Sequence, residues 1–308
     1  MRKTSAVLAT LSLAALALSG CAAAPSFAGE ACDRVGNGDA VSSAVTVTGE
    51  FGSAPDVEVF APAKFPKTSF EDVVVGDGEP LVTDTQVMTT ELSIYSAKTG
   101  EMLFQSPYSE DSESLSNIAT LVPQFPGLGP VLECATGGSR IIAGIPSDGV
   151  TAETRKNLGL GDGDAAIVVV DLLKIYPSRA DGALQFNDAR NMPTVVRAPD
   201  GTPGVIIPDT DAPDEIVTQT LIKGDGEKVT ADKTPLVNLT AVGWDDRKVT
   251  TTTWGDNPSF NLPSTAPEVA KELVGKTVGS QILVVTPASD SGPAMAYVID
   301  VLGAVTTR

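Results

Sequence analysis

The sequence contains no histidine, and this absence excludes several kinds of active site. There can be no Ser-His-Asp triad, no cysteine nucleophile assisted by histidine and no metal held by histidine. Lys and Arg (21) are far outnumbered by Asp and Glu (39), which gives a net charge of −18. That charge disfavours nucleic acid and anionic lipid head groups as partners. We therefore expect no metal site, no cofactor and no nucleic acid partner.

Long apolar runs are also scarce, apart from one at the N-terminus. A basic start and an apolar run to residue 18 precede Leu18-Ser19-Gly20-Cys21, which resembles a bacterial lipobox. This predicts a lipoprotein signal peptide at residues 1–20 and a lipid on Cys21. The alternative is an ordinary signal peptide with Cys21 incidental. No later segment approaches ~18 uninterrupted apolar residues, so the lipid is expected to be the only membrane anchor.

Only two further cysteines are present, Cys32 and Cys134. Outside the cytoplasm a lone pair of cysteines is more often a structural disulfide than a redox or metal site. The sequence has no Cys-x-x-Cys pair, and two thiols without histidine make a poor zinc site. We predict a Cys32–Cys134 disulfide that ties the N-terminal segment to the first domain.

An internal repeat organises the rest of the chain. Four motifs recur in the same order, and the distance in sequence between a motif and its copy stays equal or decreases along the chain. The pairs are residues 55–59 and 203–207, 76–79 and 224–227, 137–146 and 278–287, and 167–173 and 296–302. Single Gly-Asp-Gly matches are common, but an ordered set is not. The sequence therefore predicts two copies of one unit.

Each copy consists of short β-rich runs broken by Gly, Asp and Pro, with one place for a brief helix, at 121–132 and at 267–274. This pattern is typical of an α+β fold, with a short helix on a mostly antiparallel sheet. The predicted organisation is a signal peptide (1–20), a tether (21–44), a first domain (45–177), a linker (178–192) and a second domain (193–308).

The order of these motifs resembles the FK506-binding-protein (FKBP) family of peptidyl-prolyl cis-trans isomerases. The resemblance rests on Gly-Asp-Gly, a strand, a short helix, a Gly-Ser strand ending in Pro, and a last apolar strand with an internal Asp. It covers residues 75–175 and 223–305. It implies two tandem FKBP-like domains, each a mostly antiparallel twisted sheet wrapped on one short helix. With the lipobox, the chain also resembles surface lipoproteins of Gram-positive bacteria.

The resemblance implies isomerase activity that assists the folding of exported proteins at the outer face of the cell membrane. Its partners would be unfolded or proline-containing polypeptides, and the protein would be a monomer. The peptide bond before proline interconverts slowly between cis and trans, because the barrier is ~18–20 kcal/mol. An apolar pocket that favours the twisted peptide lowers this barrier without a nucleophile or cofactor. A chain without histidine can therefore perform this chemistry.

Carrying the family pocket onto the first copy gives three catalytic and three substrate-binding positions. The catalytic positions are Phe104, Phe125 and Leu128, and the substrate-binding positions are Leu92, Gln105 and Val168. Leu92 stands at the family's pocket tyrosine, Gln105 at its acid and Leu128 at the tryptophan of the pocket floor. The backbone N–H of Phe125 would bind the substrate carbonyl. Activity is expected mainly in this copy, which keeps Phe104 and a long segment before its last strand.

The second copy departs at least as far from the family. Leu239 replaces the tyrosine, Val249 the aromatic residue, Val269 the tryptophan, and Tyr297 adds an aromatic ring to the last strand. Each pocket stays apolar but loses stacking surface worth ~0.5–1.5 kcal/mol per aromatic pair. Leu92, Val168, Leu239 and Val269 would equally suit plain core positions. A second hypothesis therefore stays open, in which both domains bind polypeptides as a catalytically silent module.

Overall fold

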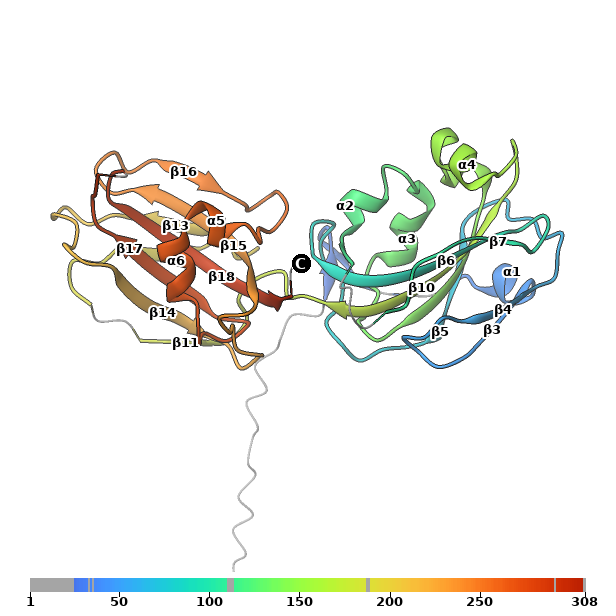
Figure 1. The fold of residues 1–308 in the computed structure, drawn as a ribbon, viewed down its shortest axis with the longest axis horizontal. Coiled ribbons are helices and arrows are strands. Elements are labelled where there is room, and N and C mark those ends of the chain that lie inside the picture. The colour runs from blue at the N-terminus through green and yellow to red at the C-terminus, as the bar shows by residue number, and fades with distance from the viewer. Residues whose placement is uncertain are drawn as a thin grey trace, which may run out of the picture.

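The computed structural model describes residues 25–32, 34, 36–109, 114–186, 189–290 and 292–306. Two β-sheets lie side by side along the long axis of the molecule, one from each half of the chain (Figure 1). The predicted signal peptide and Cys21 lie outside the described residues, so lipidation remains a prediction. No helix in the described part of the chain is long and apolar enough to cross a membrane.

The first sheet is antiparallel and has the strand order β5-β9-β10-β6-β7, with the short β8 also paired to β6. Its strands are β5 (Ser69–Val74), β6 (Met88–Ser96), β7 (Met102–Gln105), β8 (Leu115–Ser116), β9 (Arg140–Ile145) and β10 (Ala166–Ile175). The two long central strands, β6 and β10, are almost wholly buried. β10 reads as an apolar run in the sequence because both of its faces are covered, whereas β6 also buries polar residues, among them Thr89, Thr90 and Glu91.

The second sheet repeats this order as β14-β17-β18-β15-β16 and adds β11 beside β14. Its strands are β11 (Ala183–Leu184), β14 (Val217–Lys223), β15 (Thr234–Gly243), β16 (Val249–Thr252), β17 (Gln281–Thr286) and β18 (Met295–Val305). Five corresponding strands in the same order confirm the predicted duplication and the α+β tandem fold. β11 falls within the segment that the sequence assigns to the linker.

The helices are short, and in the first domain proline and glycine recur within the predicted helical segment 121–132 and interrupt it, whereas the segment 267–274 has only Pro267, at the first turn of its helix. In chain order they are α1 (Asp39–Ser42), α2 (Ile118–Leu121), η1 (Pro126–Leu128), α3 (Gly129–Leu132), η2 (Ser147–Gly149), α4 (Ala152–Leu158), α5 (Leu262–Thr265) and α6 (Pro267–Glu272). The helical segment from α2 to α3 covers one face of the first sheet, and α5 and α6 cover the matching face of the second. Each forms one apolar core with its sheet.

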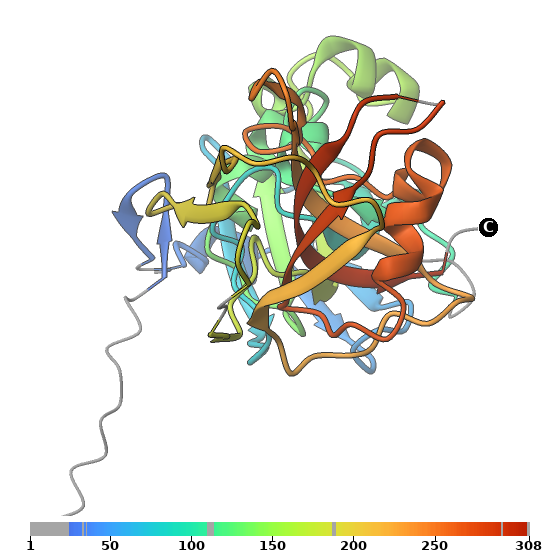
Figure 2. The same cartoon turned by 90° about the vertical axis from the view of Figure 1, so that its left-hand side faces the viewer.

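A β-hairpin covers the other face of each sheet. In the first domain it consists of β3 (Val45–Thr48) and β4 (Asp56–Val59), and in the second of β12 (Thr194–Arg197) and β13 (Pro203–Ile206). The apolar side of each hairpin packs on its sheet and forms a second core there. Figure 2 shows the hairpin and helix α6 on opposite sides of the second sheet. Each domain therefore has two cores, one on each side of its sheet.

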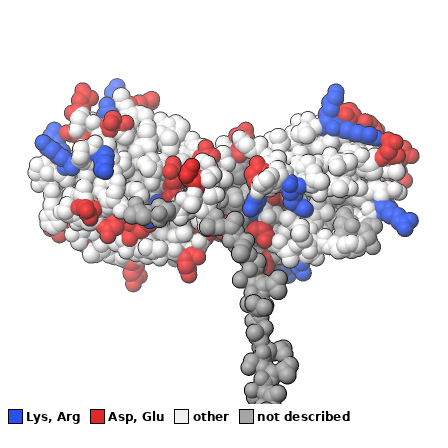
Figure 3. Space-filling model, turned by 180° about the vertical axis from the view of Figure 1, so that it is seen from behind, with Lys and Arg blue, Asp and Glu red and all other residues white. Residues whose placement is uncertain are grey.

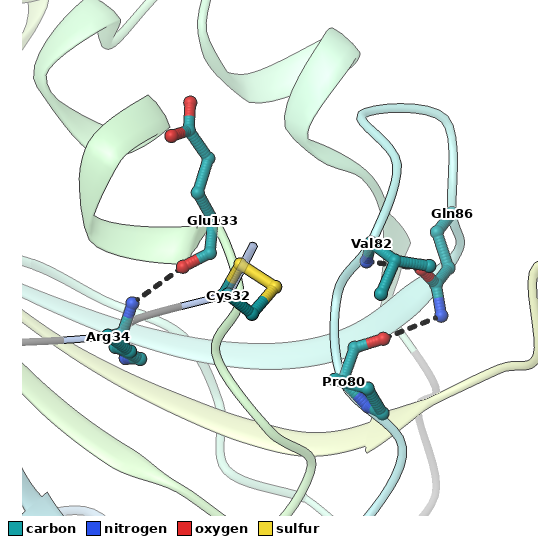
Figure 4. Close-up of a disulfide and its surroundings, with 7 residues drawn as sticks. Cys32, Arg34, Pro80, Val82, Gln86 and Glu133 are labelled. Atoms are coloured by element: carbon teal, nitrogen blue, oxygen red, sulfur yellow. Dashed lines mark hydrogen bonds between the residues drawn. A yellow bond between two sulfur atoms is a disulfide. The ribbon is translucent and has the colours of Figure 1, made fainter. Parts of the chain in front are cut away.

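The predicted tether is largely folded onto the first domain. β1 (Ser26–Phe27) and β2 (Glu30–Ala31) form a small hairpin, and the predicted Cys32–Cys134 disulfide follows directly. Beside it, Arg34 donates to the Glu133 carbonyl oxygen at 2.9 Å (Figure 4) and forms an ion pair with Asp72 at 2.7 Å. A polar composition indicated a free segment, but these long-range contacts fix it to the domain.

The two domains meet through an interdomain cluster of apolar residues, namely Val87, Leu115, Tyr176, Leu236, Leu302 and Val305. The ring of Tyr176 lies where a β-carbon on Gly303 would come within 2.6 Å of it. The side-chain nitrogen of Gln86 donates to the Tyr176 carbonyl oxygen at 2.8 Å and to the Pro80 carbonyl at 3.1 Å (Figure 4). Lys174 and Glu227 add an ion pair at 2.8 Å. The tandem therefore has a defined interface.

Candidate functional site

The first domain has a partly exposed group of apolar side chains on the helical side of its sheet. Four of them are partly buried and pack against the first core, and the fifth, Phe104, pairs across β6 and β7 with the core residue Ile94. We call this group the apolar rim, and its members are Leu92, Leu103, Phe104, Leu121 and Val122. Phe104 is 46% exposed. The rim is a part of this core that a ligand could reach from solvent.

Three predicted pocket residues lie beneath this surface rather than on it. Phe125, Leu128 and Val168 are 6%, 2% and 0% exposed and belong to the first core. Leu128 belongs to η1, directly before α3, and Val168 lies on the central strand β10, so sheet and helix bury both. They shape the floor of the site through packing and do not themselves offer contact area to a ligand.

The backbone N–H predicted to bind the substrate carbonyl already has a partner. The Phe125 N–H donates to the Leu121 carbonyl oxygen at 2.9 Å. The corresponding N–H in the second domain, that of Ala266, donates to Leu262 at the same distance. A substrate carbonyl would have to displace this intrachain bond in either domain.

Gln105 lies on the other face of the sheet. It pairs with Ser93, and its side-chain nitrogen donates to the Ser93 hydroxyl at 3.2 Å. Successive strand residues alternate between faces, and Leu92 and Ile94 face the helical side, so Ser93 faces away from it. The Tyr108 hydroxyl lies 3.4 Å from the same Ser93 oxygen, and burial raises the pKa of Tyr108 to about 12. The prediction that Gln105 belongs to the pocket is therefore wrong.

In the second domain Leu239 is buried, whereas its counterpart in the first domain, Leu92, is only partly buried. Leu239 and Val269 are buried in the helical-side core, and Tyr297 is partly buried against it. Burial raises the pKa of Tyr297, with the nearby Glu268 carboxylate adding to the effect. Leu239, Val269 and Tyr297 thus come together around one core, whereas Val249 on β16 is 58% exposed and lies outside that core.

The strand register corrects the counterpart of Phe104. Thr252 pairs with Thr240 just as Gln105 pairs with Ser93, which places Thr251, and not Val249, at the position of Phe104. The hairpin turns have the same length in both copies, at residues 97–101 and 244–248. Matching by apolar character selected Val249, two residues too early. The second domain therefore has an exposed threonine where the first has phenylalanine.

The connection before the last strand differs most between the domains. It runs from residue 146 to 165 in the first domain, where it contains η2 and α4, but only from 287 to 294 in the second. In the first domain the Thr151 N–H donates to the Gln124 carbonyl oxygen at 3.2 Å. Val150 and Leu160 of the same connection enter the first core. We call residues 146–165 the flap; it closes against the segment that carries the predicted catalytic residues.

Among the surface cavities formed by described residues are four that no predicted pocket residue lines. One of them, about 940 Å³, lies between residues 62–66, Lys98 and the two ends of the flap. No group of three or more Cys, Asp or Glu residues that could hold a metal ion occurs in the described part of the chain. On the face shown in Figure 3, Lys and Arg form separate small groups and no continuous basic patch.

Sequence reasoning missed three members of the apolar rim: Leu103, Leu121 and Val122. They precede or follow the family's pocket positions, so residue-by-residue transfer did not select them. The available signal was local, because Leu103 and Leu121 belong to short apolar runs, Met102-Leu103-Phe104 and Leu121-Val122. Their partial exposure depends on how α2 sits on the sheet, which the sequence does not specify.

No protein-family model and no curated protein matches the chain. Among solved structures, it is similar to the three FKBP domains of wheat FKBP73, with 11% identity over 77% of this chain and 94% of that one and a TM-score of 0.31. It is also similar to a peptidyl-prolyl cis-trans isomerase from Pseudomonas syringae pv. tomato (16% identity, 35% and 74% covered, TM-score 0.29). The N-terminal domain of FKBP42 from Arabidopsis thaliana matches with 11% identity, 40% and 97% covered, and a TM-score of 0.30. Likenesses of this size concern the fold alone and carry no argument about activity.

Proposed function

We propose that this chain is an FKBP-type peptidyl-prolyl isomerase that assists the folding of exported polypeptides, with weak activity confined to the first domain. The observation that carries the proposal is the apolar rim, with Phe104 46% exposed above a buried apolar core. The second domain has Thr251 at that position, and its Leu239 is buried. Only the first domain therefore has an aromatic side chain at this position on which a proline ring can pack.

The rim would act by holding the proline ring while the preceding peptide bond twists. Packing the ring on Phe104 removes apolar surface from water and keeps water from the amide. A planar amide resists twisting by ~18–20 kcal/mol. Contacts that are stronger in the twisted state than in either planar state lower this barrier. The reaction then needs neither a nucleophile nor a metal.

Weak turnover follows from the groups that are missing or occupied. The Phe125 N–H is bonded to Leu121, so a substrate carbonyl gains only the difference between two hydrogen bonds. Leucine stands at the position of the family's tyrosine and of its tryptophan, at Leu92 and Leu128. Neither can donate a hydrogen bond to the twisted peptide.

A second candidate function is binding without catalysis. It is favoured by the occupied N–H groups of Phe125 and Ala266, which are bonded in the same way in both domains. In this case the apolar rim would hold unfolded segments of exported proteins without changing the rate of proline isomerisation.

The setting of either function is part of the proposal. A lipid on Cys21 would anchor a monomer to the outer face of the membrane. The net charge of −18 would hold the body away from anionic head groups, since like charges repel. The protein would then encounter exported polypeptides as they emerge at the outer face of the membrane.

The test is a protease-coupled isomerase assay on an X-Pro tetrapeptide with the mature chain, comparing Phe104→Ala with Thr251→Ala. Both side chains are exposed, so both variants should keep the wild-type thermal midpoint. We expect Phe104→Ala to lower kcat/KM about fivefold to tenfold, as loss of an aromatic contact of ~1 kcal/mol predicts, and Thr251→Ala to leave it unchanged.

Two results would decide against catalysis in the first domain. Turnover equal to buffer for the wild-type chain removes the isomerase function. If that chain still slows aggregation of a proline-free client, and Phe104→Ala abolishes the effect, the binding function stands in its place. A larger loss in Thr251→Ala than in Phe104→Ala would assign the activity to the second domain.

A further inference from the structure

One wall of the apolar rim is the segment 115–122, and its N-terminal end is capped within the first domain. Asn117 is the N-cap of α2, where its side-chain oxygen accepts a hydrogen bond from the Thr120 N–H at 2.9 Å. The Thr120 hydroxyl in turn accepts from the Asn117 N–H at 3.2 Å. This reciprocal cap fixes where α2 begins, and with it the positions of Leu121 and Val122.

The same asparagine reaches the second domain. Its side-chain nitrogen donates to the side-chain oxygen of Asn257 at 2.7 Å. Because the Asn117 oxygen is taken by the cap, only the nitrogen is left to face Asn257, and this fixes the direction of the bond. Asn257 lies in the loop between β16 and α5, which the second sheet holds through mutual backbone hydrogen bonds of 2.8 Å between Val237 and Ser259.

Two residues before Asn117, Leu115 packs into the interdomain cluster. There it meets Tyr176 together with Leu236 and Leu302 of the second domain, whose side chains are 1% exposed or less. The segment is thus held by apolar packing at Leu115 and by a hydrogen bond at Asn117. Both contacts come from the second domain, or from the strand end that leads into it.

We propose that the second domain positions the polypeptide-binding site of the first, with Asn257 as a positioning residue for α2. This rests on the proposed function of the apolar rim. The second domain has Thr251 at the position of Phe104, yet its loop fixes the helix that supplies Leu121 and Val122. The same helix carries the carbonyl oxygen of Leu121, which accepts the Phe125 N–H. The order of α2 therefore sets both the shape of the rim and the occupation of its backbone donor.

The test replaces Asn257 in the full mature chain. Its side chain is exposed, so Asn257→Ala should fold, with a thermal midpoint lowered by no more than about 2–4 °C. We expect amide hydrogen exchange at Thr120, Leu121 and Val122 to become about fivefold faster, as loss of one hydrogen bond predicts. Exchange in the central strand β10 should stay as in the wild type. Binding of an Ala-Leu-Pro-Phe peptide, followed by NMR titration, should weaken by a similar factor.

Asn257→Asp is the matched control, because a carboxylate oxygen can accept the same bond from Asn117. It should restore both the exchange rates and the peptide affinity. Unchanged exchange in Asn257→Ala, or an aspartate variant as impaired as the alanine one, would overturn the proposal. Failure of the proposed function looks different: Phe104→Ala would leave peptide binding unaltered, while the exchange rates of Asn257→Ala would still report whether the second domain holds α2.

Discussion

The two domains have the same strand order, but the buried carboxylate on the last strand has different partners in each of them. In the first domain Asp171 forms an ion pair with Arg140 at 2.6 Å, and the two side chains are 0% and 1% exposed. Arg140 also donates to the carbonyl oxygens of Gly49, Glu50 and Ser53 in the turn of the β3–β4 hairpin. The hydrogen bond with Asp171 raises the pKa of Arg140.

In the second domain Asp300 and Gln281 take these two places. The Gln281 side-chain nitrogen donates to one oxygen of Asp300 at 2.7 Å, and the Ala180 N–H donates to the other at 2.7 Å. The nearest cation is supplied by the hairpin, where Arg197 donates to the Gln281 oxygen at 2.8 Å. Burial raises the pKa of Asp300 to about 6. The equivalent carboxylates therefore have different partners: Asp171 contacts the permanently charged Arg140, and Asp300 contacts the neutral amide of Gln281.

The largest effect is expected when the first domain is made like the second by Arg140→Gln. The change leaves Asp171 buried without its cation, which costs about 3–5 kcal/mol. Both tryptophans, Trp244 and Trp254, lie in the second domain, so their fluorescence follows that domain alone. The circular dichroism transition in urea should move to lower concentration, with the fluorescence transition moving less.

Arg155→Gln is the control for this change, since Arg155 of α4 donates only to backbone carbonyl oxygens. It should cost no more than about 1.5 kcal/mol. A loss below about 1 kcal/mol in Arg140→Gln, or a fluorescence transition that moves first, would contradict the comparison.

The next effect concerns pH and the second domain. The folded pKa of Asp300, about 6, lies above its ordinary value of 3.8, so the folded state binds the proton more tightly than the unfolded state does. The contribution of Asp300 to the free energy of unfolding is therefore largest below about pH 4. It decreases as the pH rises through 6 and does not change at higher pH, and the total decrease is about 3 kcal/mol. Between pH 4.5 and 7 the second domain should lose about 2 kcal/mol through Asp300.

Asp300→Asn should remove this part of the pH dependence, measured as the urea midpoint of tryptophan fluorescence at the two pH values. Asp171→Asn provides the contrast, because it leaves Arg140 buried without its anion and should destabilise the first domain at both. An unchanged fluorescence pH profile in Asp300→Asn would remove Asp300 as the titrating group.

The smallest effect is expected where the flap of the first domain packs on the helical segment, a contact that distinguishes the flap from the shorter connection of the second domain. A β-carbon on Gly127 would contact Ile145 and lie 3.2 Å from the Gly149 carbonyl oxygen. Gly127→Ala should therefore cost about 1–3 kcal/mol and speed hydrogen exchange in η2 and α4. The matched residue Glu268 is exposed on α6, and Glu268→Ala should change the free energy of unfolding by less than about 0.5 kcal/mol. Equal effects of the two variants would mean that the flap does not pack on the helical segment.

Part of the candidate site could be predicted from the sequence because the two copies have the same order of motifs and because turn residues mark the ends of their strands. Gly-Ser turns and prolines mark the strand ends, so Leu92 and Leu239 fall at equivalent positions in the two sheets. The exposure of Phe104 and the burial of Leu128 could not be predicted, since both are apolar and only the position of α2 and α3 separates them. Val249 was mistaken for Thr251 because residue type was matched without the register of the turn.

By itself the sequence determined the duplication, the α+β class, the disulfide partners and the absence of histidine chemistry, because these depend on residue identity and local spacing. Only the tertiary structure decided which apolar residues face solvent, which N–H groups are already bonded and how the second domain holds α2. Those properties arise from contacts between segments far apart in the chain. Burial of Asp300 beside Gln281 is of the same kind: the aspartate is visible in the sequence, but its pKa depends on what surrounds it.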